Sequence, residues 1–383
     1  MKDKDSIICF DTAMLVAIFL SFSIFVILVY TSYNCEPFKT PKLDLDNRPK
    51  VLSISCYGYG NIGDNMYSGV FKRYLERDCN VFKIRDNRMF VDSEYNLSSS
   101  PPSNDWKYDA LLIGGGGLLN KEKLNNSNTM RHYISKAMKN NKPIFIISCG
   151  IQTDDNFGSD WKELWNYASL ITVRSPEDKR IILKNTPKAN VKYQRDLGYI
   201  APHCGVYEIV DNEKTKLTMA ISGPVNPNSS EVKKIIEETK PQEIVVMNTG
   251  ARFDKDMKEW IDSANFPGIK TTKLYGEGIA NEFNFKDNER GDLNVQSTIQ
   301  VINDSFLVLS GRYHGMVFAR SLGIPCNTMG MGTNKIKWEQ PLESLDKIVQ
   351  SSYENIRLLK QGLGLPDTSD QDLAEIMNSL ESK

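Results

Sequence analysis

The sequence predicts an α/β fold with two Rossmann-like domains facing a cleft, preceded by one N-terminal transmembrane helix. Three observations lead to this prediction: an uncharged apolar run near the N-terminus, a long alternation of short apolar runs with helical patterns, and a break midway along that alternation. With 383 residues the chain is long enough for two to three domains of ordinary size. Over the whole chain the composition, 40% hydrophobic and 25% charged, is close to that of an ordinary soluble protein, and the apolar run is a local exception.

The first predicted element is a membrane anchor at residues 13–30, after a short tail at residues 1–12. The run contains no charge, Pro or Gly. As a helix it would measure about 27 Å, enough to cross a thin secretory-pathway bilayer. It exceeds the apolar core of a signal peptide, about 7 to 15 residues, and no clear cleavage site follows. We therefore expect a retained signal anchor, followed by a Pro-containing polar stem at residues 31–49.

The membrane topology stays open, because basic residues flank the anchor on both sides. They are Lys2 and Lys4 before it, and Lys39, Lys42, Arg48 and Lys50 after it. Four N-x-[ST] sequons would suit a glycosylated, lumenal domain, and they lie at Asn96, Asn125, Asn228 and Asn303.

Two series of predicted strands follow the stem. In an N-terminal Rossmann-like domain, residues 50–205, we expect strands at 51–56, 81–84, 110–113, 144–148, 170–173 and 191–193. In a C-terminal Rossmann-like domain, residues 206–340, we expect strands at 217–221, 244–247, 306–309 and 324–327, and helices at 230–239, 255–263 and 295–303. Residues 341–383 are expected to form two helices, at 342–360 and 370–380. Two such sheets would bind ligands at the carboxyl ends of their strands.

Charge and cysteine spacing exclude several classes of protein. A net charge of −1 gives no basic field for nucleic acid. The 7 cysteines show neither CxxC nor a His/Cys ligand spacing. We therefore expect no nucleic-acid partner, no metal site and no disulfide framework.

A glycine-rich loop follows the first predicted strand. Gly58, Gly60 and Gly63 match G-x-G-x-x-G ahead of a helix, where backbone N–H groups can point at an anion. Asp64 follows directly, and its carboxylate would repel a dinucleotide pyrophosphate but could accept hydrogen bonds from sugar hydroxyls. We therefore expect Asn61, Gly63 and Asp64 to line a substrate site. The alternative is a tight turn in which Asp64 only caps the helix.

Four consecutive glycines, residues 114–117, follow the strand predicted at 110–113. So many glycines in a strand-to-helix turn indicate that a ligand or another chain segment closely approaches the backbone. We expect Gly115 and Gly116 to contact substrate and Asn120 to reach into the same cleft.

The most informative segment is a strand–turn–helix unit near the end of the second series. Its helix is predicted to start at Arg312 or Tyr313 and to stop at Gly323, which places Arg312 and His314 at a helix N-terminus. Arg312 can bind a carboxylate or phosphate bidentately. A helix N-terminus disfavours an imidazolium whereas a bound dianion favours one, so His314 can act as a general acid. Further substrate-binding residues expected from this unit are Ser310, Gly311 and Tyr313.

Arg174, at the end of another predicted strand, is a second candidate for binding an anion, with simple solvation as the alternative. The other two histidines, His132 and His203, are expected to be structural or exposed.

These segments together resemble the polysaccharide pyruvyl transferase family. Its motifs stand here as Gly60-Asn61-Ile62-Gly63-Asp64, Asp109 to Gly117, Val173-Arg174-Ser175 and Ser310 to Pro325. The resemblance implies a GT-B-like fold and transfer of pyruvate from phosphoenolpyruvate to a galactose-like terminal sugar of a glycan or polysaccharide, as a cyclic ketal. It further implies that Arg312 and Arg174 hold the donor's carboxylate and phosphate, and that His314 is the acid or base. Phosphoenolpyruvate would be a co-substrate, with no further cofactor.

With the anchor, the resemblance implies a single-pass protein of the Golgi or another secretory-pathway membrane, with a lumenal catalytic domain. A nucleotide-sugar-dependent glycosyltransferase of GT-B-like fold is the main alternative. An inactive, membrane-tethered glycan-binding relative is another, and Asp64 argues against an NAD-dependent oxidoreductase.

Overall fold

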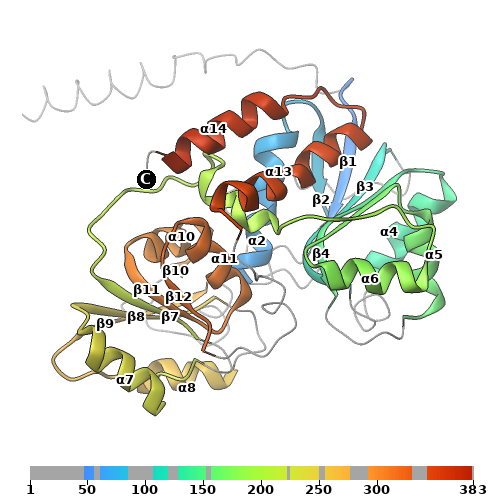
Figure 1. Ribbon diagram of the computed structural model, residues 1–383. Helices are drawn as coiled ribbons and strands as arrows, with labels where there is room; N and C mark the ends of the chain where they lie inside the picture. The colour runs from blue at the N-terminus through green and yellow to red at the C-terminus, as the bar shows by residue number, and fades with distance from the viewer. Residues whose placement is uncertain are drawn as a thin grey trace, which may run out of the picture. The chain divides into compact units, whose positions relative to one another are not determined.

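The computed structural model describes residues 47–55, 61–84, 107–119, 128–151, 157–221, 225–249, 255–276, 292–329 and 343–381 (Figure 1). The chain divides into a unit up to Arg48 and a unit from Pro49 to Lys383, and the helices and strands below belong to the second. The predicted anchor at residues 13–30 lies outside the described residues. Among the helices that are described, none has the length and hydropathy to cross a membrane.

A first sheet is built from the N-terminal half of this unit. Its strands are β1 (Lys50–Ile54), β2 (Asn80–Lys83), β3 (Ala110–Leu119), β4 (Ile144–Ile151), β5 (Leu170–Val173) and β6 (Val191–Tyr193). All pairs are parallel, in the order β2-β1-β3-β4-β5-β6. The accompanying helices are α2 (Ile62–Leu75), α4 (Asn128–Lys139), α5 (Ser159–Tyr167) and α6 (Pro176–Asn185). The continuous apolar runs in β3 and β4 reflect burial on both faces.

A second parallel sheet follows. Its strands are β7 (Lys216–Ala220), β8 (Glu243–Asn248), β9 (Lys270–Gly276), β10 (Asp292–Leu293), β11 (Ser305–Ser310) and β12 (Cys326–Asn327), in the order β10-β9-β8-β7-β11-β12. Its helices are α7 (Ser230–Thr239), α8 (Lys255–Ser263), α10 (Val295–Asn303) and α11 (Tyr313–Ser321). The predicted α/β class with parallel sheets is confirmed, and so are the bounds of α7, α8 and α10.

Two features of the sheets differ from the prediction. Strands β9 and β10 are missing from it, because KTTKLYG lacks an apolar run and β10 is only 2 residues long. The predicted turn at residues 114–117 is wrong, because β3 continues through the glycines to Leu119. Gly114 pairs with Ile147 and Gly116 with Cys149, so the ladder to β4 extends past the apolar run.

Each sheet has a point at which the strand order changes direction. In the first sheet it lies between β1 and β3, and in the second between β7 and β11. Ligands of open parallel sheets bind at the carboxyl ends of the strands at such points. One glycine-rich segment follows β1, and the other lies at the end of β3. Arg312 and His314 follow β11. The candidate residues therefore come from both switch points.

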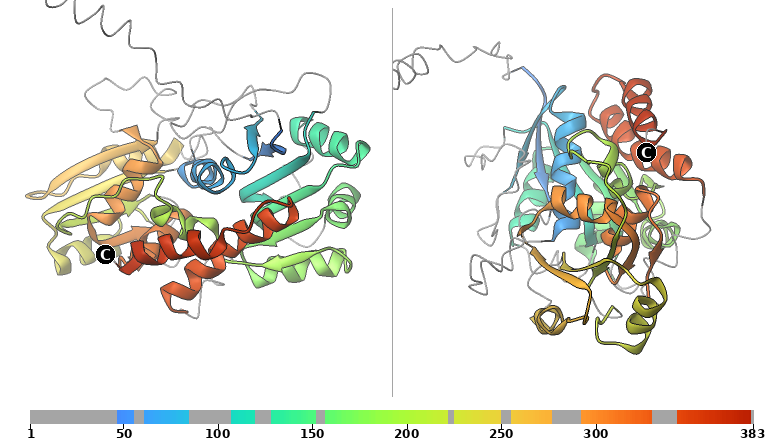
Figure 2. Two further views of the ribbon diagram at one scale, coloured as in Figure 1. Left: turned by 90° about the horizontal axis from the view of Figure 1, so that it is seen from above. Right: turned by 90° about the vertical axis from the view of Figure 1, so that its left-hand side faces the viewer.

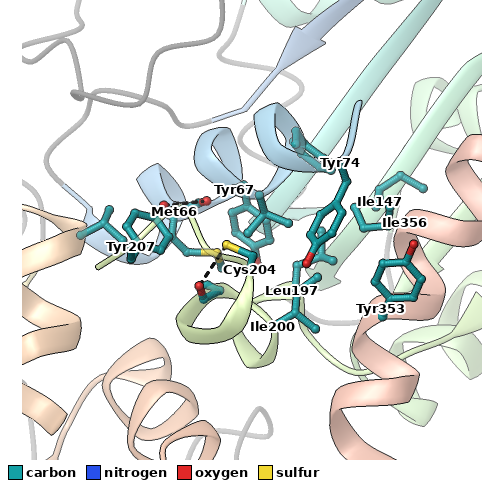
Figure 3. Close-up of a cluster of buried hydrophobic side chains, with 14 of the residues drawn as sticks. Met66, Tyr67, Tyr74, Ile147, Leu197, Ile200, Cys204, Tyr207, Tyr353 and Ile356 are labelled. Atoms are coloured by element: carbon teal, nitrogen blue, oxygen red, sulfur yellow. Dashed lines mark hydrogen bonds between the residues drawn. The ribbon is translucent and has the colours of Figure 1, made fainter. Parts of the chain in front are cut away.

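The C-terminal helices connect elements of both sheets. Helix α13 (Leu345–Gly362) contacts α2, β4 and β5 as well as α11, and α14 (Ser369–Glu381) packs on α13. Figure 2 shows these red helices lying across the elements of both sheets. They also contact two short 3-10 helices, η1 (Leu197–Tyr199) and η2 (Ala201–His203). Figure 3 shows the buried cluster that joins these elements, in which Tyr74 of α2 meets Tyr353 of α13 edge-on.

Candidate active site

The N-terminus of α11 carries the two residues with the clearest chemistry. Strand β11 ends at Ser310, whose hydroxyl donates to the Arg312 carbonyl at 2.7 Å and accepts from the Arg312 N–H at 3.3 Å. Arg312 is the N-cap residue, so its side chain and that of His314 project from the first turn of α11. A Cβ at Gly315 would overlap the Ser310 hydroxyl, so glycine lets the helix start this close to the strand. The predicted helix start and its stop at Gly323, where φ is +68°, are confirmed.

The N-terminus of α2 lies at the meeting point of the two sheets. Its first N–H, from Ile62, donates to the carbonyl of Thr249, directly after β8, at 3.1 Å. Asn61 caps the helix by accepting from the Gly63 N–H at 3.2 Å, and its amide donates to Asp64 at 2.9 Å. The buried Asp64 is therefore not the cap of this turn.

His314 is packed against α2. Its Nε2 lies 3.4 Å from the hydroxyl of Tyr67 and 3.7 Å from Oδ1 of Asp196. On the other side of the ring, a Cβ at Gly63 would overlap Nδ1. The rings of Tyr67 and Tyr313 stand edge-on to the imidazole at 6.0 and 5.2 Å between centroids. The imidazole is thus held on both of its nitrogen-bearing sides.

Asp196, shortly after the end of β6, supplies the carboxylate of this site and was not predicted from the sequence. Its carboxylate is fully buried and accepts from the Tyr67 hydroxyl at 2.9 and 3.0 Å, from Nη1 of Arg174 at 3.0 Å, and from the Gly198 N–H at 2.8 Å. Burial raises the pKa of Asp196, but His314, Arg174 and the Gly198 N–H together lower it well below its usual range. Asp196 is therefore ionised. The one sequence signal for Asp196 was that the charged pair Arg195–Asp196 directly precedes an apolar segment at 197–201.

Arg174 is buried at the end of β5, so simple solvation is ruled out. Its guanidinium lies 4.4 Å from the centroid of the Tyr313 ring, and a Cβ at Gly150 would overlap it from β4. Burial lowers the pKa of Arg174, but Tyr313 and Asp196 raise it above the usual value overall. Arg174 is a fixed cation of the site.

Arg312 is the second cation, and its neighbours compensate less for the loss of water than those of Arg174 do. Burial lowers the pKa of Arg312 to about 10, and Asp64 only partly opposes this. A half-buried guanidinium whose charge has lost water contacts gains from an incoming anion, because the anion restores the electrostatic stabilisation lost from water. This environment therefore favours binding of an anionic ligand.

The glycines of β3 face α2. Gly115 and Gly116 have φ of +78° and +75°. A Cβ at Gly115 would overlap the Tyr67 ring, and one at Gly116 would overlap the Asp64 carboxylate. Of the two predicted reasons for close backbone approach, the structure shows another chain segment, and contact of these glycines with substrate stays a prediction.

The structure thus brings together residues predicted from distant segments. They are Asn61, Gly63, Asp64, Gly115, Gly116, Arg174, Ser310, Gly311, Arg312, Tyr313 and His314. Asn120, Gly58 and Gly60 lie outside the described residues. His203 is buried elsewhere, 3.0 Å from the Ser321 carbonyl, and His132 is exposed. Within the described ranges no three His, Cys, Asp or Glu residues form a group that could hold a metal ion.

An imidazole beside an ionised carboxylate, with the buried Arg174 and the half-buried Arg312, is the set of groups that proton transfer on a small anionic substrate requires. The chain belongs to the polysaccharide pyruvyl transferase family, whose model matches residues 24–331. It is therefore a transferase of that family.

Several solved structures share similarity at low sequence identity. UDP-GlcNAc 2-epimerase from Neisseria meningitidis, bound to UDP-GlcNAc, is 12% identical with a TM-score of 0.45, covering 85% of this chain and 94% of its own. Another UDP-N-acetylglucosamine 2-epimerase is 15% identical with a TM-score of 0.44, covering 86% and 90%. A glycosyltransferase from Rickettsia africae is 10% identical with a TM-score of 0.42, covering 88% and 100%. No curated protein matches the sequence.

Proposed function

We propose that this protein transfers pyruvate from phosphoenolpyruvate to two hydroxyls of a galactose-like terminal sugar on a glycan or polysaccharide, forming a cyclic ketal and releasing phosphate. The observation that carries the proposal is the position of His314 at the N-terminus of α11, beside Asp196 and next to Arg312. Membership of the family supports the reaction class.

Donor binding is assigned to the two arginines and the N-terminus of α11. Phosphoenolpyruvate carries two anionic groups, a carboxylate and a phosphate. The site offers one arginine for each of them, Arg312 at the carboxyl end of β11 and Arg174 at the carboxyl end of β5. Bidentate guanidinium contacts suit both anions. The N–H groups of the first turn of α11 add favourable partial charge. Ser310, Gly311 and Tyr313 would shape this end of the site.

The chemistry needs one proton donor and one group that stabilises the leaving phosphate. His314 protonates the methylene carbon of the donor, and the first sugar hydroxyl adds to the adjacent carbon through an oxocarbenium-like transition state. The carbon–oxygen bond to phosphate then breaks while the second hydroxyl adds to the same carbon. One hydroxyl proton ends on the new methyl group and the other on phosphate, so atoms and charge balance. Arg312 stabilises the departing phosphate, and the proposed reaction uses no metal or further cofactor.

We assign acceptor recognition to the N-terminus of α2, which packs against His314 of α11. Asn61, Gly63 and Asp64 lie at the first turn of α2, and the Asp64 carboxylate can accept hydrogen bonds from sugar hydroxyls. We propose that the acceptor also contacts Gly115, Gly116 and Asn120.

We also propose the setting of the reaction. The apolar run at residues 13–30 is a signal anchor in the Golgi or another secretory-pathway membrane, with a stem at 31–49 and a lumenal, glycosylated catalytic part. That part is divided, in GT-B-like manner, into domains at residues 50–205 and 206–340 and C-terminal helices at 341–383. A lumenal site would meet glycans as they are built.

A transfer assay tests the proposal. The full chain is incubated with phosphoenolpyruvate and a small set of galactosides and mannosides, and ketal formation and phosphate release are measured together. We expect equal amounts of both products, loss of both with His314→Ala, and no loss with the exposed control His132→Ala. The same acceptors are offered UDP-, GDP- and CMP-sugars. Sugar transfer without pyruvyl transfer would overturn the proposal in favour of a glycosyltransferase.

A further inference from the structure

We infer that Asp196 is the positioning residue of this site: its carboxylate fixes the His314 ring with Nε2 toward itself and so determines which ring nitrogen carries the proton. The geometric part of this inference stands on the contacts of Asp196. Only the identity of the substrate rests on the proposed function.

The carboxylate itself is held from several directions. Oδ1 accepts from the Gly198 N–H at 2.8 Å and faces Nε2 of His314 at 3.7 Å. Oδ2 accepts from Arg174 at 3.0 Å. The Tyr67 hydroxyl lies within 3.0 Å of both oxygens. A buried carboxylate with donors on both oxygens has one orientation, so it can impose that orientation on its neighbour.

The backbone beneath the carboxylate is fixed by α13 and β4. Ser352 donates to the Asp196 carbonyl at 2.7 Å, and Asn355 donates to the Arg195 carbonyl at 2.8 Å. On the other flank, the Leu197 N–H donates to the hydroxyl of Ser148 in β4 at 3.0 Å. Ser352 and Asn355 are fully buried. The position of Asp196 is thus set by an element on each side.

The consequence for His314 follows from charge. A negative charge on the Nε2 side favours the neutral tautomer that carries its proton on Nε2, which leaves the lone pair on Nδ1. Nδ1 lies against Gly63, where the missing side chain leaves the first turn of α2 adjacent to the ring. The same division of roles between two imidazole nitrogens operates wherever a buried carboxylate orients a catalytic histidine.

Two variants separate positioning from folding. Asp196→Asn keeps the shape but removes the charge, which also leaves the buried Arg174 without its carboxylate partner. Tyr67→Phe keeps the Asp196–Arg174 ion pair and removes only one hydroxyl from the group around Nε2. Tyr74→Phe is the matched control, because Tyr74 lies on the same helix and is also buried (Figure 3).

The first readout is the tautomer of His314, which does not depend on any substrate. The chain has only 3 histidines, so the full chain labelled with 15N-histidine gives few imidazole signals, and His132→Ala and His203→Gln assign two of them. We expect the neutral His314 ring to be protonated on Nε2. Asp196→Asn should produce a mixture of tautomers, Tyr67→Phe a smaller change of the same sign, and Tyr74→Phe none. An unchanged His314 signal in both site variants would overturn the inference.

The second readout divides kcat from KM. We expect Asp196→Asn to lower kcat by about 100-fold or more, as loss of an orienting carboxylate does elsewhere. Tyr67→Phe should lower kcat by about 10-fold, with KM for phosphoenolpyruvate changing less than kcat in both variants. If Asp196→Asn does not fold, Tyr67→Phe provides the test. A raised KM at unchanged kcat in that variant would contradict the positioning role of Asp196. A wild-type chain that transfers no pyruvate while its His314 tautomer responds to Asp196→Asn refutes the proposed function alone.

Discussion

His314 lies against the first turn of α2 because Gly63 has no side chain there. The ring would overlap even a methyl group at this position. Gly63 was predicted to contact substrate as part of a glycine-rich loop. The structure gives it a further role, since it determines where the imidazole can lie.

Gly63→Ala therefore tests how sensitive the site is to the position of His314. The added methyl group must displace the ring from its place beside Asp196, and a misplacement of about 1 Å can cost about 100-fold in rate. We expect pyruvyl transfer to fall by about that factor while the circular dichroism spectrum stays that of a folded protein. Gly158→Ala is the control, because a Cβ there meets nothing within 4 Å. Equal activity of the two variants would contradict the proposed packing.

Arg312 allows a prediction about stability. Burial lowers the pKa of Arg312 to about 10, so the group stays charged at pH 7 but its charge is less well stabilised than in water, and Arg312→Met should raise the melting temperature of the ligand-free protein. Phosphoenolpyruvate at 100 times Kd should stabilise the wild-type protein by about 2.7 kcal/mol and the variant hardly at all. Thermal melts with and without ligand measure both. An equal ligand-induced shift in wild type and variant would remove Arg312 from the donor site.

Sequence motifs predicted one half of this residue constellation and missed the other. Arg312 and His314 were identifiable because a strand, a turn and a helix stop stand together in the chain. Asp196 and Tyr67 were not, since they are 129 residues apart and meet only through the fold. Neither lies in a motif with its own local geometry.

At the scale of elements, the alternation of apolar runs predicted most strands, because buried parallel strands are apolar throughout. It missed β9 and β10, where polar residues occupy the strand, and it ended β3 too early at the glycines. Glycine is a weak strand former, but here it is the residue that lets α2 pack onto the strand. The packing of α2 on β3 thus determined the length of this strand more than the local propensity of its residues did.

Helix α13 acts on the site through hydrogen bonds to the backbone at 195–196. Ser352→Ala removes the bond to the Asp196 carbonyl and should cost about 1 kcal/mol of unfolding free energy. We expect kcat to fall several-fold with little change in KM for the donor. Gln350→Ala, on the exposed side of the same helix, should change neither. Unfolding curves and steady-state kinetics on the three proteins provide the comparison, and a fall in stability without a fall in kcat would make Ser352 purely structural.

At the scale of the whole unit, the site is assembled where the switch points of two sheets meet, so its charges also contribute to the stability of the unit. The pKa of Asp196 lies well below its usual range in the folded state. Its contribution to stability is therefore fully present above the ordinary carboxyl pKa, and it is lost as the pH falls toward the lowered value.

This sign gives a test by acid. Wild type should exceed Asp196→Asn in melting temperature at pH 7, and the difference should shrink as the pH is lowered from 4 toward 2. Thermal melts followed by circular dichroism at several pH values measure this difference. A gap that is constant with pH would show that the Asp196 carboxylate contributes nothing through its charge.

Helix α13 is synthesised after the carboxylate and the imidazole that it helps to align. The donors that fix Asp196 come from residues 352 and 355 of a chain of 383, whereas the carboxylate and the imidazole are made earlier. A growing chain on the ribosome can hold every reactive side chain and still lack the helix that aligns them. A nonsense mutation ahead of α13 would therefore yield a protein that keeps these reactive side chains but lacks the helix that helps to align them.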